Sequence, residues 1–70
     1  MEKFTLKESE EYIELNNLIK ILGWVATGGE AKIRIQEGEI KVNDQVEIRV
    51  RKKVRSGETV TFANEKCIVE

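Results

Sequence analysis

The fold is decided by the stretch from Thr27 to Gly57, which has the sequence TGGEAKIRIQEGEIKVNDQVEIRVRKKVRSG. It begins with a helix-start pattern and continues as alternating apolar and polar residues, a period typical of strands. It ends in a run with five cations in seven positions and no acid, namely Arg49, Arg51, Lys52, Lys53 and Arg55. An enzyme has no need of such a run, whereas a surface that meets a polyanion does.

A helix is predicted directly after Thr27. Thr27 and Glu30 have the spacing of a capping box, in which the hydroxyl and the carboxylate bind free backbone amides. Gly28 and Gly29 are poor helix formers, and they allow another chain to approach the first turn, whose amides suit an anion. We expect the helix to run through residue 37 and to stop at Gly38.

After Gly38 the period changes to two, which predicts two paired strands. Apolar residues alternate with polar ones over residues 40–42 and again over residues 46–51. The apolar faces match only if Val42 lies opposite Val46, which leaves Asn43-Asp44-Gln45 as a three-residue loop. This register would also place Lys41 opposite Glu47, and Arg49 opposite Glu39, as cross-strand ion pairs.

The first third of the chain predicts a short strand over residues 3–6 and a helix over residues 10–22. Ser9 supplies a hydroxyl for the first amides, and the acids that follow suit the helix dipole. Gly23 can take the left-handed conformation that ends a helix. An apolar stripe would face the core, and it consists of Tyr12, Leu15, Leu18, Ile19 and Leu22.

The last part of the chain predicts a hairpin. Ser56-Gly57 forms a turn, and Val60 and Phe62 point inward from the strand that follows. Asn64-Glu65 closes the hairpin and sets Cys67 opposite Phe62. Two packed helices followed by a small, mostly antiparallel sheet make an α+β fold.

Composition limits the classes of function. Seventy residues make one domain, residues 1–70, and no apolar run or signal pattern indicates a membrane. The net charge of −1 hides an uneven distribution, because residues 30–55 carry eight cations against five acids. One cysteine and no histidine fit a reducing cytoplasm and argue against a His/Cys metal site. No convergent carboxylate pair or activated nucleophile is present, so we expect no enzyme, no catalytic residue, no metal and no cofactor.

The order of these motifs resembles the S-four RNA-binding domain, first named after a ribosomal small-subunit protein. The resemblance spans about residues 10–62 and is carried by E-A-K at 30–32, I-Q-E-G-E-I-K-V-N at 35–43 and S-G-E-T-V at 56–60. The pieces L-G-W at 22–24 and G-G at 28–29, with the short length, are most similar to the stand-alone bacterial YbcJ family.

The resemblance implies a fold in which a helix pair packs on the sheet and the helix-to-strand corner grips structured RNA. It also implies a binding module, since such domains serve in ribosomal proteins, tRNA synthetases and pseudouridine synthases. One departure concerns the start of the second helix. Many relatives have Ser-Arg there, whereas this chain has Gly28-Gly29, so only backbone amides remain to contact phosphate.

The candidate RNA-binding residues are basic or lie at the predicted corner. Lys32 is expected to be exposed, and Lys41 either contacts phosphate or pairs with Glu47. Arg34 is expected to pair with the acids of its own helix. The complete candidate set is Gly28, Gly29, Lys32, Lys41, Asn43, Arg51, Lys52, Lys53 and Arg55, of which Asn43 is first a turn residue. Trp24 either stacks a base or caps the core of the helix pair.

Two other classes of protein are alternatives to an RNA-binding module. A protein-interaction adaptor would dock on the ribosome or on an RNA-processing enzyme through protein contacts. A ubiquitin-like carrier would end in Gly-Gly, whereas this chain ends in Cys67-Ile68-Val69-Glu70. We therefore expect a cytoplasmic monomer that binds structured RNA, ribosomal or transfer RNA, with ribosomal or RNA-processing proteins as further partners.

Overall fold

A five-stranded sheet forms one side of the molecule in the computed structural model, which describes residues 1–70. The strand order is β1-β7-β6-β3-β4, and only β1 and β7 run parallel. A separate two-stranded ribbon pairs β2 (Ile13–Glu14) with β5 (Lys53–Val54). The sheet strands are β1 (Glu2–Phe4), β3 (Ile40–Val42), β4 (Gln45–Val46), β6 (Thr59–Phe62) and β7 (Glu65–Val69).

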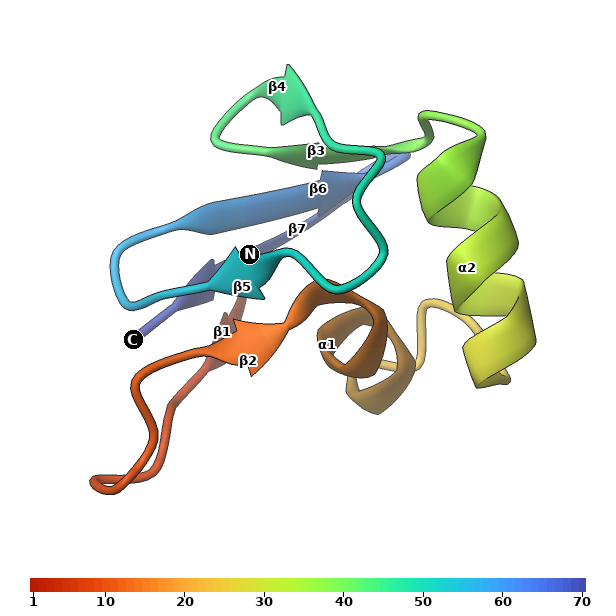
Figure 1. Ribbon diagram of the computed structural model, residues 1–70. Coiled ribbons are helices and arrows are strands. Elements are labelled where there is room, and N and C mark those ends of the chain that lie inside the picture. The colour runs from red at the N-terminus through yellow and green to blue at the C-terminus, as the bar shows by residue number, and fades with distance from the viewer.

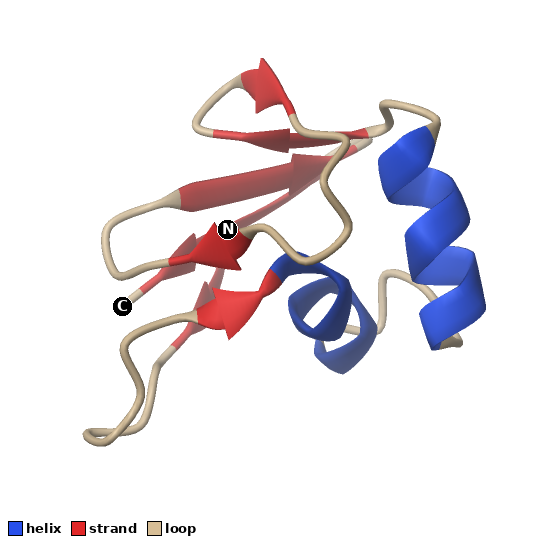
Figure 2. Ribbon diagram, viewed as in Figure 1, coloured by secondary structure: helices blue, strands red, loops and turns tan.

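The two helices, α1 (Leu15–Ile21) and α2 (Gly28–Gln36), lie together beside the strands (Figure 2). Twelve buried apolar residues form one core that joins all three parts of the fold. The helices supply residues such as Leu18 and Ile35, the sheet supplies Ile40 and Val60, and the ribbon supplies Val54. The predicted α+β fold, two packed helices with a mostly antiparallel sheet, is confirmed.

The first helix begins five residues later than the sequence predicted. Residues 13–14 form β2 instead, and Ser9 caps nothing, because α1 starts at Leu15 with Glu14 as its first flanking residue. The free amides of Leu15 and Asn16 donate to the carbonyls of Lys52 and Val50, at 2.9 and 3.1 Å. A tertiary partner therefore replaces the local cap. The predicted helix end is confirmed, since Gly23 has φ 76°.

The second helix agrees with its prediction. The Thr27 hydroxyl accepts from the Glu30 amide at 3.1 Å, and the Glu30 carboxylate accepts from the Ala26 amide at 2.8 Å. This arrangement is a capping box, except that the Glu30 carboxylate binds the amide of Ala26 instead of the amide of the N-cap residue Thr27. Ala31 and Ile35 are fully buried, and Gly38 ends the segment with φ 78°.

The hairpin after Gly38 was predicted in the wrong register. Lys41 lies opposite Val46, and the loop has two residues, Asn43 and Asp44, with φ 53° and 67°. Two positive φ values give the turn that best suits the twist of paired strands. The strand then ends at Val46, and the Glu47 amide makes a last bond to the Ile40 carbonyl at 3.0 Å. Residues 48–52 leave the sheet to reach α1, and Ile48 stays 60% exposed.

The last hairpin is also shifted. Cys67 lies opposite Val60 rather than Phe62, and the turn is formed by Ala63 and Asn64, with Ala63 at φ 52°. A shift of two residues keeps each side chain on its predicted face. Cys67 is fully buried as predicted, and burial, followed by the charge of Glu2, raises the pKa of its thiol.

Candidate nucleic-acid interface

The basic segment, residues 49–55, is held to the fold through its backbone. Its carbonyls at positions 50 and 52 accept from the first amides of α1, and β5 pairs with β2. Val54 is the fully buried apolar anchor of the segment. Because the carbonyls and Val54 face inward, the cationic side chains are left to point toward solvent (Figure 1 shows β5 beside β2).

Five cations surround one shallow hollow of about 360 Å³, and no apolar residue lines it. We call this the basic surface, and it consists of Arg49, Arg51, Lys52, Lys53 and Arg55. Salt bridges within the protein involve only Arg34 and Arg49, so the other four members of the basic surface have no acidic partner. Four unpaired cations around one hollow make a site that favours a polyanion.

Arg49 differs from its neighbours because it is paired. Its guanidinium binds the Glu47 carboxylate at 2.9 and 3.0 Å, and its amide donates to the same group. The predicted pairing of Arg49 with Glu39 is therefore wrong. The Arg49 hydrogen bonds lower the pKa of Glu47 to about 2, against the opposing effect of its partial burial. Glu47 therefore stays ionised and keeps Arg49 occupied.

Tyr12 was predicted to be a core residue, and this prediction is wrong. The side chain is half-buried, and the Lys53 ammonium and the Arg55 guanidinium lie 5.1 and 5.6 Å from the ring centroid. The pairing of Ile13 with Val54 explains this, since Tyr12 precedes β2 and follows the outward face of the ribbon. The alternation of residues 12–15 could have indicated a strand, but the same residues also fit the apolar stripe of a helix, which was the pattern used for the prediction.

Asn43 is a structural turn residue in the first place. Its side chain donates to Glu58 at 3.0 Å and accepts from the Thr59 amide at 3.0 Å. Glu58, which the sequence did not single out, also accepts from the Arg55 amide at 2.7 Å. This carboxylate joins the β3–β4 turn to the end of the basic segment. Asn43 and Lys52 line one further hollow of about 200 Å³ beside that junction.

The remaining candidates are not gathered at the basic surface. Lys41 is exposed and forms no salt bridge, so its predicted pairing with Glu47 is wrong. Lys32 is exposed on α2, and Gly28 and Gly29 lie at the start of that helix, on the far side of α1 from β5 (Figure 1). Arg34 binds Glu30 and Glu39, at 3.6 and 3.3 Å.

The indole of Trp24 is engaged inside the protein. Its N–H donates to the Glu2 carboxylate at 2.8 Å, and its ring lies 6.3 Å from the ring of Phe62. Trp24 packs against the hydrophobic core. These contacts support the second of the two predicted roles, in which Trp24 caps the core.

The fold and this surface define a class of protein. The S4 domain family matches residues 4–70, and the chain belongs to it. Neither helix has the length and apolar character needed to cross a bilayer.

The chain is similar in sequence to two curated relatives and in fold to one solved structure. YbcJ of Escherichia coli (strain K12) is 48% identical over 52 residues, which make up 74% of each chain. YbcJ of Shigella flexneri matches equally well, with 48% identity over 52 residues. The solution structure of YbcJ from E. coli superposes with a TM-score of 0.74 and 42% identity, and covers 99% of this chain and 86% of that one. That structure is described as having an αL motif involved in RNA binding.

Proposed function

We propose that this chain is a cytoplasmic, monomeric, non-enzymatic RNA-binding module that grips structured RNA, ribosomal or transfer RNA, through the basic surface. The observation that carries the proposal is the cluster of four unpaired cations, Arg51, Lys52, Lys53 and Arg55, around one open hollow. Membership of the S4 domain family, and the RNA-binding motif described for YbcJ, support the same function.

The mechanism is electrostatic and depends on shape. Lysine and arginine side chains neutralise phosphates and release condensed counterions, which is the main source of affinity for a polyanion. The backbone of the basic segment is hydrogen-bonded to α1 and β2, so the cationic side chains project from a backbone of fixed position. With a net charge of −1, the protein lacks strong long-range attraction, so contact depends on this local cluster.

The proposal is tested by changing Arg51, Lys52 and Lys53 together to glutamine. Binding of a labelled stem-loop RNA and of a transfer RNA is measured by fluorescence anisotropy at several salt concentrations. Affinity should fall for both RNAs, and two lost phosphate contacts should make the slope of log K against log salt shallower by about 1.5. The free energy of unfolding should change by no more than about 0.5 kcal/mol, because none of the three side chains lies in the core or forms a salt bridge.

A matched control changes Lys3, Lys7 and Lys20 to glutamine. These three side chains are exposed and lie outside the basic surface, and the change in net charge is the same. The control variant should keep the affinity and the salt slope of the original protein. Equal losses in both triple variants would mean that net charge, not the basic surface, governs binding.

One structural observation supports the alternative function of a protein-interaction adaptor. Val46 and Ile48 are 56% and 60% exposed, next to the basic segment. An adaptor would bind its protein partner through such apolar side chains, with little dependence on salt, and would bind bare RNA weakly. Unchanged RNA affinity and slope in the Arg51/Lys52/Lys53 variant would favour this alternative.

A further inference from the structure

One aromatic side chain is not explained by the core. The chain has four aromatic residues, and three of them, Phe4, Trp24 and Phe62, pack against the hydrophobic core. Tyr12 does not belong to that cluster, although its ring is large and half-buried. Its position is instead set by β2, which begins at the next residue and pairs with β5, so that Tyr12 continues the outward face of the ribbon.

The surroundings of the ring are cationic on the side of β5. The ammonium of Lys53 and the guanidinium of Arg55 lie within 5.1 and 5.6 Å of the ring centroid, and both belong to the basic surface. Tyr12 therefore lies inside the group of side chains that we propose to hold phosphates. An aromatic ring among phosphate-binding cations is the arrangement with which proteins hold unpaired nucleotides, because every base can stack on it.

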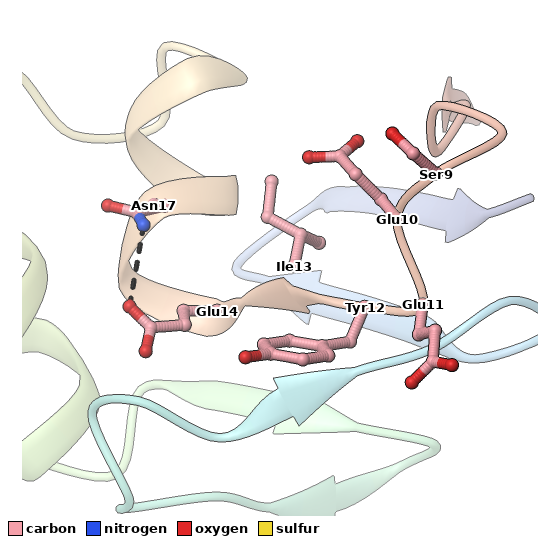
Figure 3. Close-up of a pocket in the computed structure, with 7 residues that line it drawn as sticks. All are labelled: Ser9, Glu10, Glu11, Tyr12, Ile13, Glu14 and Asn17. Atoms are coloured by element: carbon pink, nitrogen blue, oxygen red, sulfur yellow. Dashed lines mark hydrogen bonds between the residues drawn. The ribbon is translucent and has the colours of Figure 1, made fainter.

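Tyr12 also lines an open hollow of about 480 Å³ (Figure 3). Its other lining residues are Ser9, Glu10, Glu11, Ile13, Glu14 and Asn17. Figure 3 shows the ring extended along β2, with its hydroxyl group on the side of Glu14. Three carboxylates repel a phosphate backbone from this hollow but do not repel an uncharged base. The charges therefore give a bound strand a direction, with phosphates toward Lys53 and Arg55 and a base toward the ring.

We infer that Tyr12 stacks an unpaired base of the bound RNA, so that the site receives a junction between paired and unpaired nucleotides. The inference rests on the proposed RNA-binding function. Unpaired bases in loops and bulges are the part of structured RNA that aromatic side chains recognise. In the free protein the Lys53 and Arg55 side chains lie near the ring. In the complex these side chains bind phosphates, and the ring stacks on the base.

The test compares Tyr12→Leu with Tyr12→Phe on two RNAs, a stem-loop and the same stem as a blunt-ended duplex. Leucine removes the π-face and keeps an apolar side chain, whereas phenylalanine keeps the ring. Tyr12→Leu should weaken binding of the stem-loop by about tenfold, within the range for loss of one stacked base, and leave the duplex unchanged. Tyr12→Phe should bind both RNAs as the original protein does.

A second measurement uses the fact that Tyr12 is the only tyrosine. In protein with labelled tyrosine, the ring protons give a single set of NMR signals, which should move upfield when the stem-loop is added and stay in place with the duplex. Equal losses on both RNAs would overturn the inference, since Tyr12 would then only orient Lys53 and Arg55. Unchanged stem-loop affinity in Tyr12→Leu would overturn it as well.

The two proposals fail in different ways. If the Arg51/Lys52/Lys53 variant loses affinity while Tyr12→Leu does not, the stacking role is wrong and the proposed function stands. If the original protein binds neither RNA, the proposed function is wrong and the stacking role with it.

Discussion

Glu47 is the residue that decides how many cations are free at the basic surface. Its side chain is 12% exposed, and it receives three hydrogen bonds from Arg49. Since hydrogen bonds from Arg49 hold its pKa at about 2 instead of 4.5, folding favours the ionised carboxylate. The stabilisation is complete above about pH 4.5 and is lost as the pH falls toward 2.

We expect Glu47→Gln to lower the free energy of unfolding by about 0.5–1 kcal/mol at pH 7, because the exposed partner Arg49 limits the strength of the pair. The difference from the original protein should shrink as urea denaturation is repeated at pH 4 and pH 2.5. Glu65→Gln, at an exposed carboxylate without a hydrogen bond, is the control and should show no such trend. A difference that stays constant over this pH range would contradict the argument.

At the scale of elements, the two glycines at the start of α2 have either a structural or a functional role, and alanine substitution distinguishes the two. A methyl group added at Gly28 would meet no atom within 4 Å, and one at Gly29 only the Thr27 hydroxyl at 3.9 Å. Neither glycine has a positive φ. Alanine should therefore stabilise the protein at either position, by about 0.4–1 kcal/mol, through the reduced entropy of the unfolded chain.

The same alanine variants test whether RNA approaches the first turn of α2. If the backbone amides there contact phosphate, Gly28→Ala and Gly29→Ala should weaken binding of the stem-loop while thermal unfolding shows a raised midpoint. Raised stability with unchanged affinity would remove both glycines from the candidate site. Gly57, whose φ of 92° requires glycine, should instead lose stability on change to alanine.

The elements that the sequence predicted well are those with local causes. The ends of α2 follow from Thr27, Glu30 and Gly38, which act within a few residues of themselves. The start of α1 could not be predicted in this way, because its amides bind carbonyls more than thirty residues away, at positions 50 and 52. The same long-range contact ends β4 early and turns the predicted long basic strand into the segment that carries the basic surface.

In the candidate site, too, the features with local causes were predicted and those with long-range causes were not. The cations at 51–53 and 55 were predicted as candidate contacts from a local run of charge without acids, and they form no salt bridge. The position of Tyr12 beside them, and the bonds of Glu58 to two turns, depend on the pairing of β2 with β5 and on the β3–β4 turn. No periodicity within one segment contains that information.

For the whole molecule, the question is whether bound RNA touches one face or two. The longest dimension of the molecule is 31 Å, and Lys32 lies on α2, outside the basic surface. Lys32→Gln and Arg34→Gln form a matched pair on one helix, since each removes one cation. Lys32 is exposed and unpaired, whereas Arg34 already binds Glu30 and Glu39.

If RNA spans both faces, Lys32→Gln should make the slope of log K against log salt shallower by about 0.7–0.9, and Arg34→Gln should hardly change it. Combined with the Arg51/Lys52/Lys53 variant, the Lys32 change should add its full effect, because well-separated sites act independently. A slope that Lys32→Gln leaves unchanged would remove Lys32 from the contact. If Gly28→Ala and Gly29→Ala also leave the affinity unchanged, the RNA would lie along the ribbon of β2 and β5, and α2 would serve to pack the core.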